Sequence, residues 1–155
     1  MKATVLCLPW LLLAASAAHA QQPSSASGCP QLPAGAGLEW EHRATADSDF
    51  CRALREDGSE AFGLYIADSS PFEPRRKNRE ETGQVGGFEV QWYRAEIATR
   101  PDIAARETLI ELPDGRVAHL WLQAPTGEQL ERALEVARGL RFGAERQIAG
   151  GSNAP

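Results

Sequence analysis

The chain lacks the short motifs by which several common enzyme classes are recognised. None of GxSxG, HExxH, GxxxxGK[ST], GxGxxG or an EF-hand loop occurs in its 155 residues. These motifs are typical of α/β-hydrolases, zinc peptidases, P-loop nucleotide hydrolases, dinucleotide-binding enzymes and calcium-binding proteins. A catalytic site would therefore have to be assembled from scattered residues, and the sequence predicts neither a cofactor nor a metal site.

Positive charge is also scarce. Lys and Arg together number 16 against 21 Asp and Glu, which gives a net charge of −5. Nucleic-acid-binding domains usually carry a basic surface and a high isoelectric point. The sequence therefore argues against a nucleic-acid partner. Arg outnumbers Lys fourteen to two, a bias typical of GC-rich bacterial genomes.

Long apolar runs are missing except at the N-terminus, where about 14 apolar residues follow Lys2 and precede the small-residue motif Ala18-His19-Ala20. A membrane-spanning helix needs about 20 residues, whereas this layout is typical of a signal peptide. We predict that residues 1–20 are a signal peptide cleaved after Ala20. The mature protein is then periplasmic or secreted, without stable membrane insertion after cleavage. A retained anchor and a lipoprotein acylated at Cys29 are the alternatives; the polar run before Cys29 disfavours the lipoprotein.

Cysteine is limited to three residues, and Cys7 would be lost with the signal peptide. Disulfides form in exported proteins, so we predict a Cys29–Cys51 disulfide. It would close a loop of about 20 residues and contribute about 3 kcal/mol. No CxxC motif occurs, and two cysteines with His42 and His119 make a poor zinc site. A reactive pair, or a disulfide to a second chain, remains an alternative.

Composition divides the expected mature chain into three parts. Residues 21–37 form a Pro/Ser/Gly-rich N-terminal segment with little regular structure, and residues 143–155 form a flexible tail. Residues 38–142 between them are a single domain, because their number suits one hydrophobic core.

The pair Asp57-Gly58 between two β-rich runs predicts a β-hairpin. With a two-residue turn, Cys51 pairs with Leu64 and Arg55 pairs with Glu60. Cys51 then shares its face with several apolar residues, which indicates a core position.

A second hairpin is predicted at Asp114-Gly115. A two-residue turn would pair Leu112 with Val117, Ile110 with His119, and Thr108 with Trp121. Both faces of this hairpin are substantially apolar, which is typical of strands in the middle of a sheet covered on both sides. We therefore place Trp121 in the core, together with Trp92.

The remaining elements are two strands and one helix. Residues 88–93 alternate in polarity and predict a half-buried strand that turns Tyr93 to the surface, while residues 38–43 suit an edge strand. Residues 126–140 combine a capping box with an apolar stripe at helical spacing. Together these features predict an α+β fold, an antiparallel β-sheet built from hairpins with one C-terminal amphipathic helix packed on one face.

Positive charge is concentrated at a single place, in Arg75, Arg76, Lys77 and Arg79, although nearby glutamates reduce the local sum to +1. Residues 68–87 show no clear periodicity and predict a long loop. Such loops in compact domains are usually functional or disordered. The cluster is either a solvated loop or a contact surface, and as a surface it would suit an acidic protein or an anionic envelope polymer.

Two functions have support in the sequence, and a third, a small-molecule carrier, has no sequence feature for or against it. The first is a small exported, non-enzymatic binding or accessory protein of the bacterial cell envelope, for example of inhibitor type, with Arg75, Arg76, Lys77, Arg79 and Tyr93 as its binding residues. The alternative is a periplasmic hydrolase whose active site is assembled across strands from Glu107, Glu111 and His119. Four residues apart on one strand, the two glutamates would stand about 13 Å apart, too far for the carboxylate pair of a glycosidase.

Overall fold

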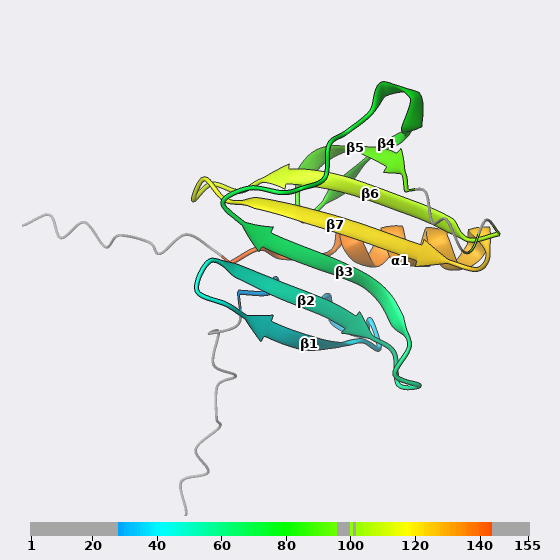
Figure 1. Cartoon of the computed structure of the whole chain (residues 1–155). Helices are drawn as coiled ribbons and strands as arrows, with labels where there is room; N and C mark the ends of the chain where they lie inside the picture. Colours follow the sequence, from blue (N-terminus) through cyan, green and yellow to red (C-terminus); the bar gives the residue numbers. More distant parts are fainter. Residues whose placement is uncertain (1–27, 96–99, 101, 144–155) are drawn as a thin grey trace, which may run out of the picture.

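The structure is a computed structural model, and it describes residues 28–95, 100 and 102–143. Seven antiparallel strands form one sheet in the order β1-β2-β3-β7-β6-β5-β4 (Figure 1). The elements are β1 (Glu39–Ala44), β2 (Ser48–Leu54), β3 (Glu60–Ala67), the 3-10 helix η1 (Arg76–Asn78), β4 (Arg79–Val85), β5 (Phe88–Arg94), β6 (Ala104–Glu111), β7 (Val117–Ala124) and α1 (Gly127–Arg138). The predicted α+β fold is confirmed.

Two meanders make up the sheet. Strands β1 to β3 form the first and β4 to β7 form the second, and they join where β3 pairs with β7. The segment from β3 to β4 therefore carries the chain from the middle of the sheet to its far edge, crossing in front of β7 and β6 in Figure 1.

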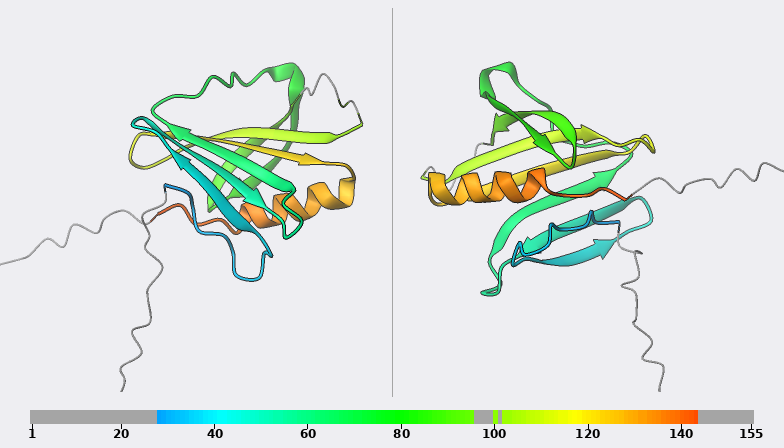
Figure 2. Two further views of the ribbon diagram at one scale, coloured as in Figure 1. Left: turned by 60° about the horizontal axis from the view of Figure 1, so that its bottom comes forward. Right: turned by 180° about the vertical axis from the view of Figure 1, so that it is seen from behind.

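The hydrophobic core lies between α1 and the sheet. The view from behind in Figure 2 shows α1 lying across this face of the sheet. Helix α1 begins as predicted, because the Thr126 hydroxyl accepts a hydrogen bond from the backbone N–H of Gln129 at 3.2 Å. Its buried side chains are Leu130, Ala133 and Ala137, and they pack on β4, β6 and β7. One stripe of small and aliphatic residues thus covers one face of the sheet.

The predicted disulfide is present and joins Cys29 to Cys51 with a Cα–Cα distance of 5.8 Å. It holds the segment 28–38 against β1 and β2, on the same side of the sheet as α1. The Trp40 indole donates to the carbonyl oxygen of Pro30 at 2.6 Å, which adds a second attachment. The His42 side chain is only 23% exposed, and its Nε2 lies 2.8 Å from a carboxylate oxygen of Asp49.

Both Asp-Gly hairpins exist, but their turns contain three residues instead of two. Gly58 and Gly115 have φ angles of 77° and 87°, and each turn is closed by a hydrogen bond between the residues that flank it, Arg55 with Ser59 and Leu112 with Arg116. The last residue of such a three-residue turn adopts a left-handed conformation, which favours glycine at this position.

The longer turn changes the register of the second hairpin. His119 pairs with Leu109 instead of Ile110, and Trp121 pairs with Glu107 instead of Thr108. Because a shift of one residue moves every side chain to the opposite face, Trp121 is half-buried on the face opposite α1 and not in the core. Trp92 is buried as predicted.

In the first hairpin the longer turn changes only the pairs next to it, because a β-bulge restores the predicted register further along the strands. Cys51 pairs with Leu64 as predicted, but Glu60 pairs with Leu54 and not with Arg55, because the register shifts after Ala53.

The expected loop at residues 68–87 is shorter than predicted. Residues 79–85 form β4, an edge strand, and Gly86 and Gly87 form a two-residue turn into β5 with φ angles of 58° and 89°. A Gly-Gly pair between two strands is a known signal for such a turn. Only residues 68–78, which include η1, form the connection between β3 and β4; we call them the crossing segment.

Candidate functional site

The face of the sheet opposite α1, here called the open face, carries one row of side chains across all seven strands. Consecutive cross-strand pairs link, from β1 to β4, Glu41, Arg52, Gly63, Trp121, Glu107, Tyr93 and Arg79. A second row on the same face contains Phe50, Tyr65, His119 and Leu109. Apart from the buried Gly63 and the exposed Arg79, all these residues are half-buried. The open face is therefore aromatic at its centre and charged at both ends.

Trp121 lies over Gly63 at the centre of the open face. A β-carbon at position 63 would overlap the six-membered ring of the indole, so glycine makes room for it. The indole N–H donates to Glu60 at 2.9 Å, and Glu60 also accepts from the Nε of Arg52 at 2.8 Å. Arg52 donates in turn to Glu41 at 3.2 Å. This series of charge-assisted hydrogen bonds fixes the indole position.

The aromatic rings of the open face form a continuous series. Trp121 contacts Phe50 and His119, with ring centroids 5.6 and 5.5 Å apart. Phe72, from the crossing segment, stacks on His119 at 4.8 Å with an interplanar angle of 8°, and meets Tyr93 edge-on at 6.0 Å. Phe72 therefore anchors the crossing segment to the open face.

His119 and Glu107 form a pair beside Phe72. Their Nε2 and Oε2 atoms are 3.2 Å apart, and their side chains are 15% and 20% exposed. Burial lowers the pKa of His119 and raises the pKa of Glu107, so the environment favours the neutral form of each. His119 is thus a half-buried histidine whose ring nitrogen lies within hydrogen-bond distance of Glu107.

A small polar pocket of about 290 Å³ opens next to this pair. It is lined by Pro71, Phe72, Glu73, Arg75, Asn78, Tyr93 and Glu107. The pocket therefore combines two residues proposed for binding, Arg75 and Tyr93, with Glu107, which was proposed for catalysis. No Ser, Thr or Cys lines it. Glu111 is exposed, further along β6, and takes no part in the pair.

The four basic residues that were predicted to bind a partner lie next to the open face. Arg75, Arg76 and Lys77 occupy the crossing segment and η1, and Arg79 begins β4 opposite Tyr93. All four are exposed. Among the described residues none of them makes an ion pair. Of the nearby carboxylates, Glu80 lies near Arg94 and Arg106, Glu81 accepts from Arg106 at 3.0 Å, and Glu73 is exposed. The local sum of +1 thus understates the free positive charge, and we call these four residues the basic cluster.

Sequence reasoning missed Gly63, Phe72 and Trp121 as parts of this surface. A glycine inside a strand often marks a close approach of another group, so Gly63 carried a usable signal. Phe72 carried none, because its partners His119 and Tyr93 are distant in sequence.

No helix in the described part of the chain is long and apolar enough to cross a membrane. Among the same residues, no three His, Cys, Asp or Glu side chains cluster as a metal site would require.

No protein-family model, curated protein or solved structure matches this chain.

Proposed function

We propose that this protein is a small exported, non-enzymatic binding protein of the bacterial envelope, of accessory or inhibitor type. Its binding surface is the open face together with the basic cluster, and its partner is an acidic segment of another protein. One observation carries the proposal: four exposed cations without ion pairs in the described structure adjoin an aromatic sheet face that α1 leaves uncovered.

The composition of this surface supports a protein partner. Interface centres are enriched in Trp, Tyr and Arg, and their rims are polar. Here Trp121 and Tyr65 are half-buried near the centre of the sheet, and aliphatic Leu109 lies beside them. A purely polyanionic polymer would use the basic cluster but would leave these apolar side chains without a partner. An acidic polypeptide with apolar residues would contact both the basic cluster and the apolar side chains of the open face.

The charges define the expected role of the basic cluster. Exposed cations at the edge of an interface mainly accelerate association and make it dependent on salt. The aromatic centre then supplies the buried area that slows dissociation. Arg75 and Arg79 also flank Tyr93, so the cluster is continuous with the aromatic surface.

Affinity capture from native envelope extract tests this function. Three baits are compared: the wild type, a variant with Arg75, Arg76, Lys77 and Arg79 changed to Ala, and a control with Arg138 and Arg141 changed to Glu. The control changes the net charge by the same four units at exposed positions away from the basic cluster. A partner retained by the wild type and the control but lost by the first variant supports the proposal.

Protease treatment of the extract before capture separates the two classes of partner. Loss of the captured material supports an acidic protein. Binding that survives proteolysis identifies an anionic polymer and contradicts the choice of a protein. Equal capture by all three baits removes the basic cluster from the binding surface.

A hydrolase remains a second candidate, favoured by the His119–Glu107 pair that adjoins the polar pocket. With no Ser, Thr or Cys in the pocket, water would be the attacking group and His119 its base. Turnover of ester or glycoside substrates that His119→Ala abolishes and the basic-cluster variant retains would support this candidate. Full turnover by His119→Ala would exclude it.

A further inference from the structure

Strand β1 forms the end of the sheet opposite to β4 and the basic cluster (Figure 1). It pairs with β2 on its inner side, and among the described residues no other main-chain group bonds its backbone. The Thr45 N–H donates to the Ser48 carbonyl at 2.8 Å, and bonded and non-bonded pairs alternate in antiparallel ladders. The N–H and C=O groups of Trp40, His42 and Ala44 therefore point outward.

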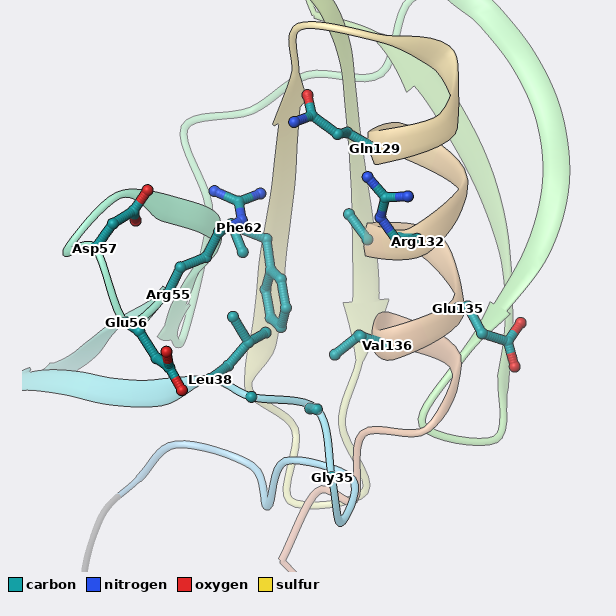
Figure 3. A pocket seen from close by; sticks show the side chains of 14 residues that line it. Gly35, Leu38, Arg55, Glu56, Asp57, Phe62, Gln129, Arg132, Glu135 and Val136 are labelled. Carbon is teal, nitrogen blue, oxygen red and sulfur yellow. The ribbon is translucent and has the colours of Figure 1, made fainter.

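The segment 28–38 does not cover this edge, because it is attached on the α1 side of the sheet. The disulfide and the hydrogen bond from the Trp40 indole hold it there. Figure 3 shows Leu38, which directly precedes β1, with its side chain beside Phe62 in the groove between α1 and the β2–β3 hairpin. The chain thus enters β1 from the covered face and leaves the outer edge accessible.

The two edges of the sheet differ in their suitability for pairing. An unpaired edge is a template for association, and proteins commonly protect it with bulges and charges. Strand β4 has both, because its register shifts between Arg79 and Thr82 and the adjacent Glu80 and Glu81 lie within that interval. Strand β1 pairs with β2 without a register shift over all six of its residues. Its outward groups can therefore form a regular ladder.

The charges of β1 select one register for pairing with a second copy of the chain. Glu41 and Arg43 lie on the open face, opposite Arg52 and Phe50 of β2. In a symmetric antiparallel pair centred on His42, Glu41 of each copy lies opposite Arg43 of the other. Centring on Glu41 or on Arg43 instead places that residue opposite its own copy, and like charges directly opposite are destabilising.

The side chains of β1 are compatible with this register. Arg43 is 74% exposed, and its Nη2 donates to Glu41 of its own strand at 2.9 Å. In the pair each guanidinium would lie between the Glu41 carboxylates of both copies. The Nε2 of His42 lies 2.8 Å from Asp49 of β2, which holds the ring toward its own sheet and away from the twofold axis.

We propose that two copies of the protein form a symmetric dimer by pairing their β1 strands antiparallel about His42. The two seven-stranded sheets become one continuous sheet. The twofold axis is perpendicular to the sheet, so both open faces lie on one side and the two basic clusters lie at opposite ends. Isologous pairing closes the assembly at two copies. A single strand pair buries little side-chain area, so the dimer is weak and depends on concentration.

Sedimentation velocity of the purified protein from micromolar to millimolar concentration tests the dimer. We expect the mean sedimentation coefficient to rise with concentration toward that of two copies. Amide hydrogen exchange at the same concentrations locates the contact. The amide protons of Trp40, His42 and Ala44 should exchange more slowly at the higher concentration, whereas those of β4 at the other edge should not change.

Ala44→Pro tests the contribution of the backbone. Proline is tolerated at an edge strand where the N–H faces solvent, so the fold should be retained. The substitution removes one outward donor from each copy, and the dimer should dissociate about tenfold more readily. Arg138→Glu, an exposed position on α1, is the control and should leave the dissociation constant within twofold.

Exchange of charges tests the register. Arg43→Glu makes positions 41 and 43 both negative, and Glu41→Arg makes both positive, so neither variant should dimerise alone. An equimolar mixture should dimerise within twofold of the wild type, because each copy then supplies the charges opposite to those of the other. The dispersion of the amide spectra shows that each variant is folded; if a charge variant is not, the Ala44→Pro comparison decides.

Three results would overturn the proposal. These are a protein that stays monomeric at millimolar concentration, a dimer that Ala44→Pro leaves unchanged, and a mixture of the two folded charge variants that associates no more than each variant alone. Because β1 and the basic cluster lie at opposite ends of the sheet, none of these results depends on the partner proposed for the open face.

Discussion

The indole of Trp121 occupies the space that a side chain at position 63 would need. The two residues pair across the central β3–β7 contact, and the indole N–H bonds Glu60 on the same strand as Gly63. Gly63 thus determines how the largest side chain of the open face lies.

Gly63→Ala should therefore displace Trp121 and break its hydrogen bond to Glu60. Overpacking of this kind costs about 1–3 kcal/mol, so the free energy of unfolding should fall by that amount in urea denaturation. Gly127→Ala is the matched control, because a β-carbon there has no atom within 4 Å. Equal stability of the wild type and Gly63→Ala would show that the indole moves at no cost.

Phe72→Ala should release the crossing segment from the open face. The segment carries three trypsin sites, at Arg75, Arg76 and Lys77, so release is measured as the rate of tryptic cleavage there. Loss of an aromatic stack worth about 1 kcal/mol predicts a rate about fivefold higher. Phe50→Ala, at the other end of the aromatic series, should leave that rate unchanged; acceleration by both variants would indicate general loosening of the sheet.

Removal of the Cys29–Cys51 disulfide should lower the free energy of unfolding by about 3 kcal/mol, since it closes a loop with a sequence separation of 22. The measurement is urea denaturation of the Cys29→Ala/Cys51→Ala variant. Reductant should destabilise the wild type by a similar amount and leave the variant unaffected. A wild type that is indifferent to reductant would contradict this role.

Stability should depend on pH through His119. Burial lowers its folded-state pKa below the usual 6.5, so the unfolded state binds protons more readily. The contribution of neutral, half-buried His119 to the free energy of unfolding is complete above pH 6.5. It is lost as the pH falls through the folded-state pKa. Between pH 7.5 and 5.5 the wild type should therefore lose more stability than His119→Asn. Parallel urea midpoints for the two proteins would disprove this.

Glu107 should act in the opposite direction. Burial raises its folded-state pKa above the usual 4.5, so its contribution is complete below pH 4.5 and is lost as the pH rises through the folded-state pKa. Glu107→Gln retains a polar group for His119 and avoids burying a charge. We expect the variant to gain stability relative to the wild type as the pH is raised from 4 to 7, measured by urea midpoints. A difference that is constant with pH would contradict this.

Local sequence signals predicted the elements well. The Asp-Gly pairs located two hairpins, alternation located β5, and the capping residue Thr126 located the start of α1. Register was less accessible, because Asp-Gly closes two-residue and three-residue turns alike. That single ambiguity placed Trp121 on the wrong face. The charged sequence of β4 did not indicate a strand. The side chains of an edge strand can be solvated, so they carry no pattern that distinguishes the strand from a loop.

The candidate site depended on contacts that local patterns do not encode. Glu60 and Trp121 are 61 residues apart in sequence and meet only because β7 pairs with β3. The stacking of Phe72 on His119 similarly requires the chain to cross the sheet between β3 and β4. The basic cluster could be found from sequence because its members lie within five consecutive residues, whereas the aromatic surface next to it could not.

The position of β7 has a consequence for the order of folding. Strands β1 to β3 can pair among themselves as soon as residue 67 is available, but the second edge of β3 has no partner until residues 117–124 arrive. Contacts this far apart in sequence slow folding, and an unpaired inner edge is a template for association with other chains. A nascent chain that stops before β7 therefore exposes the middle of its sheet, and chaperone protection would matter most during that interval.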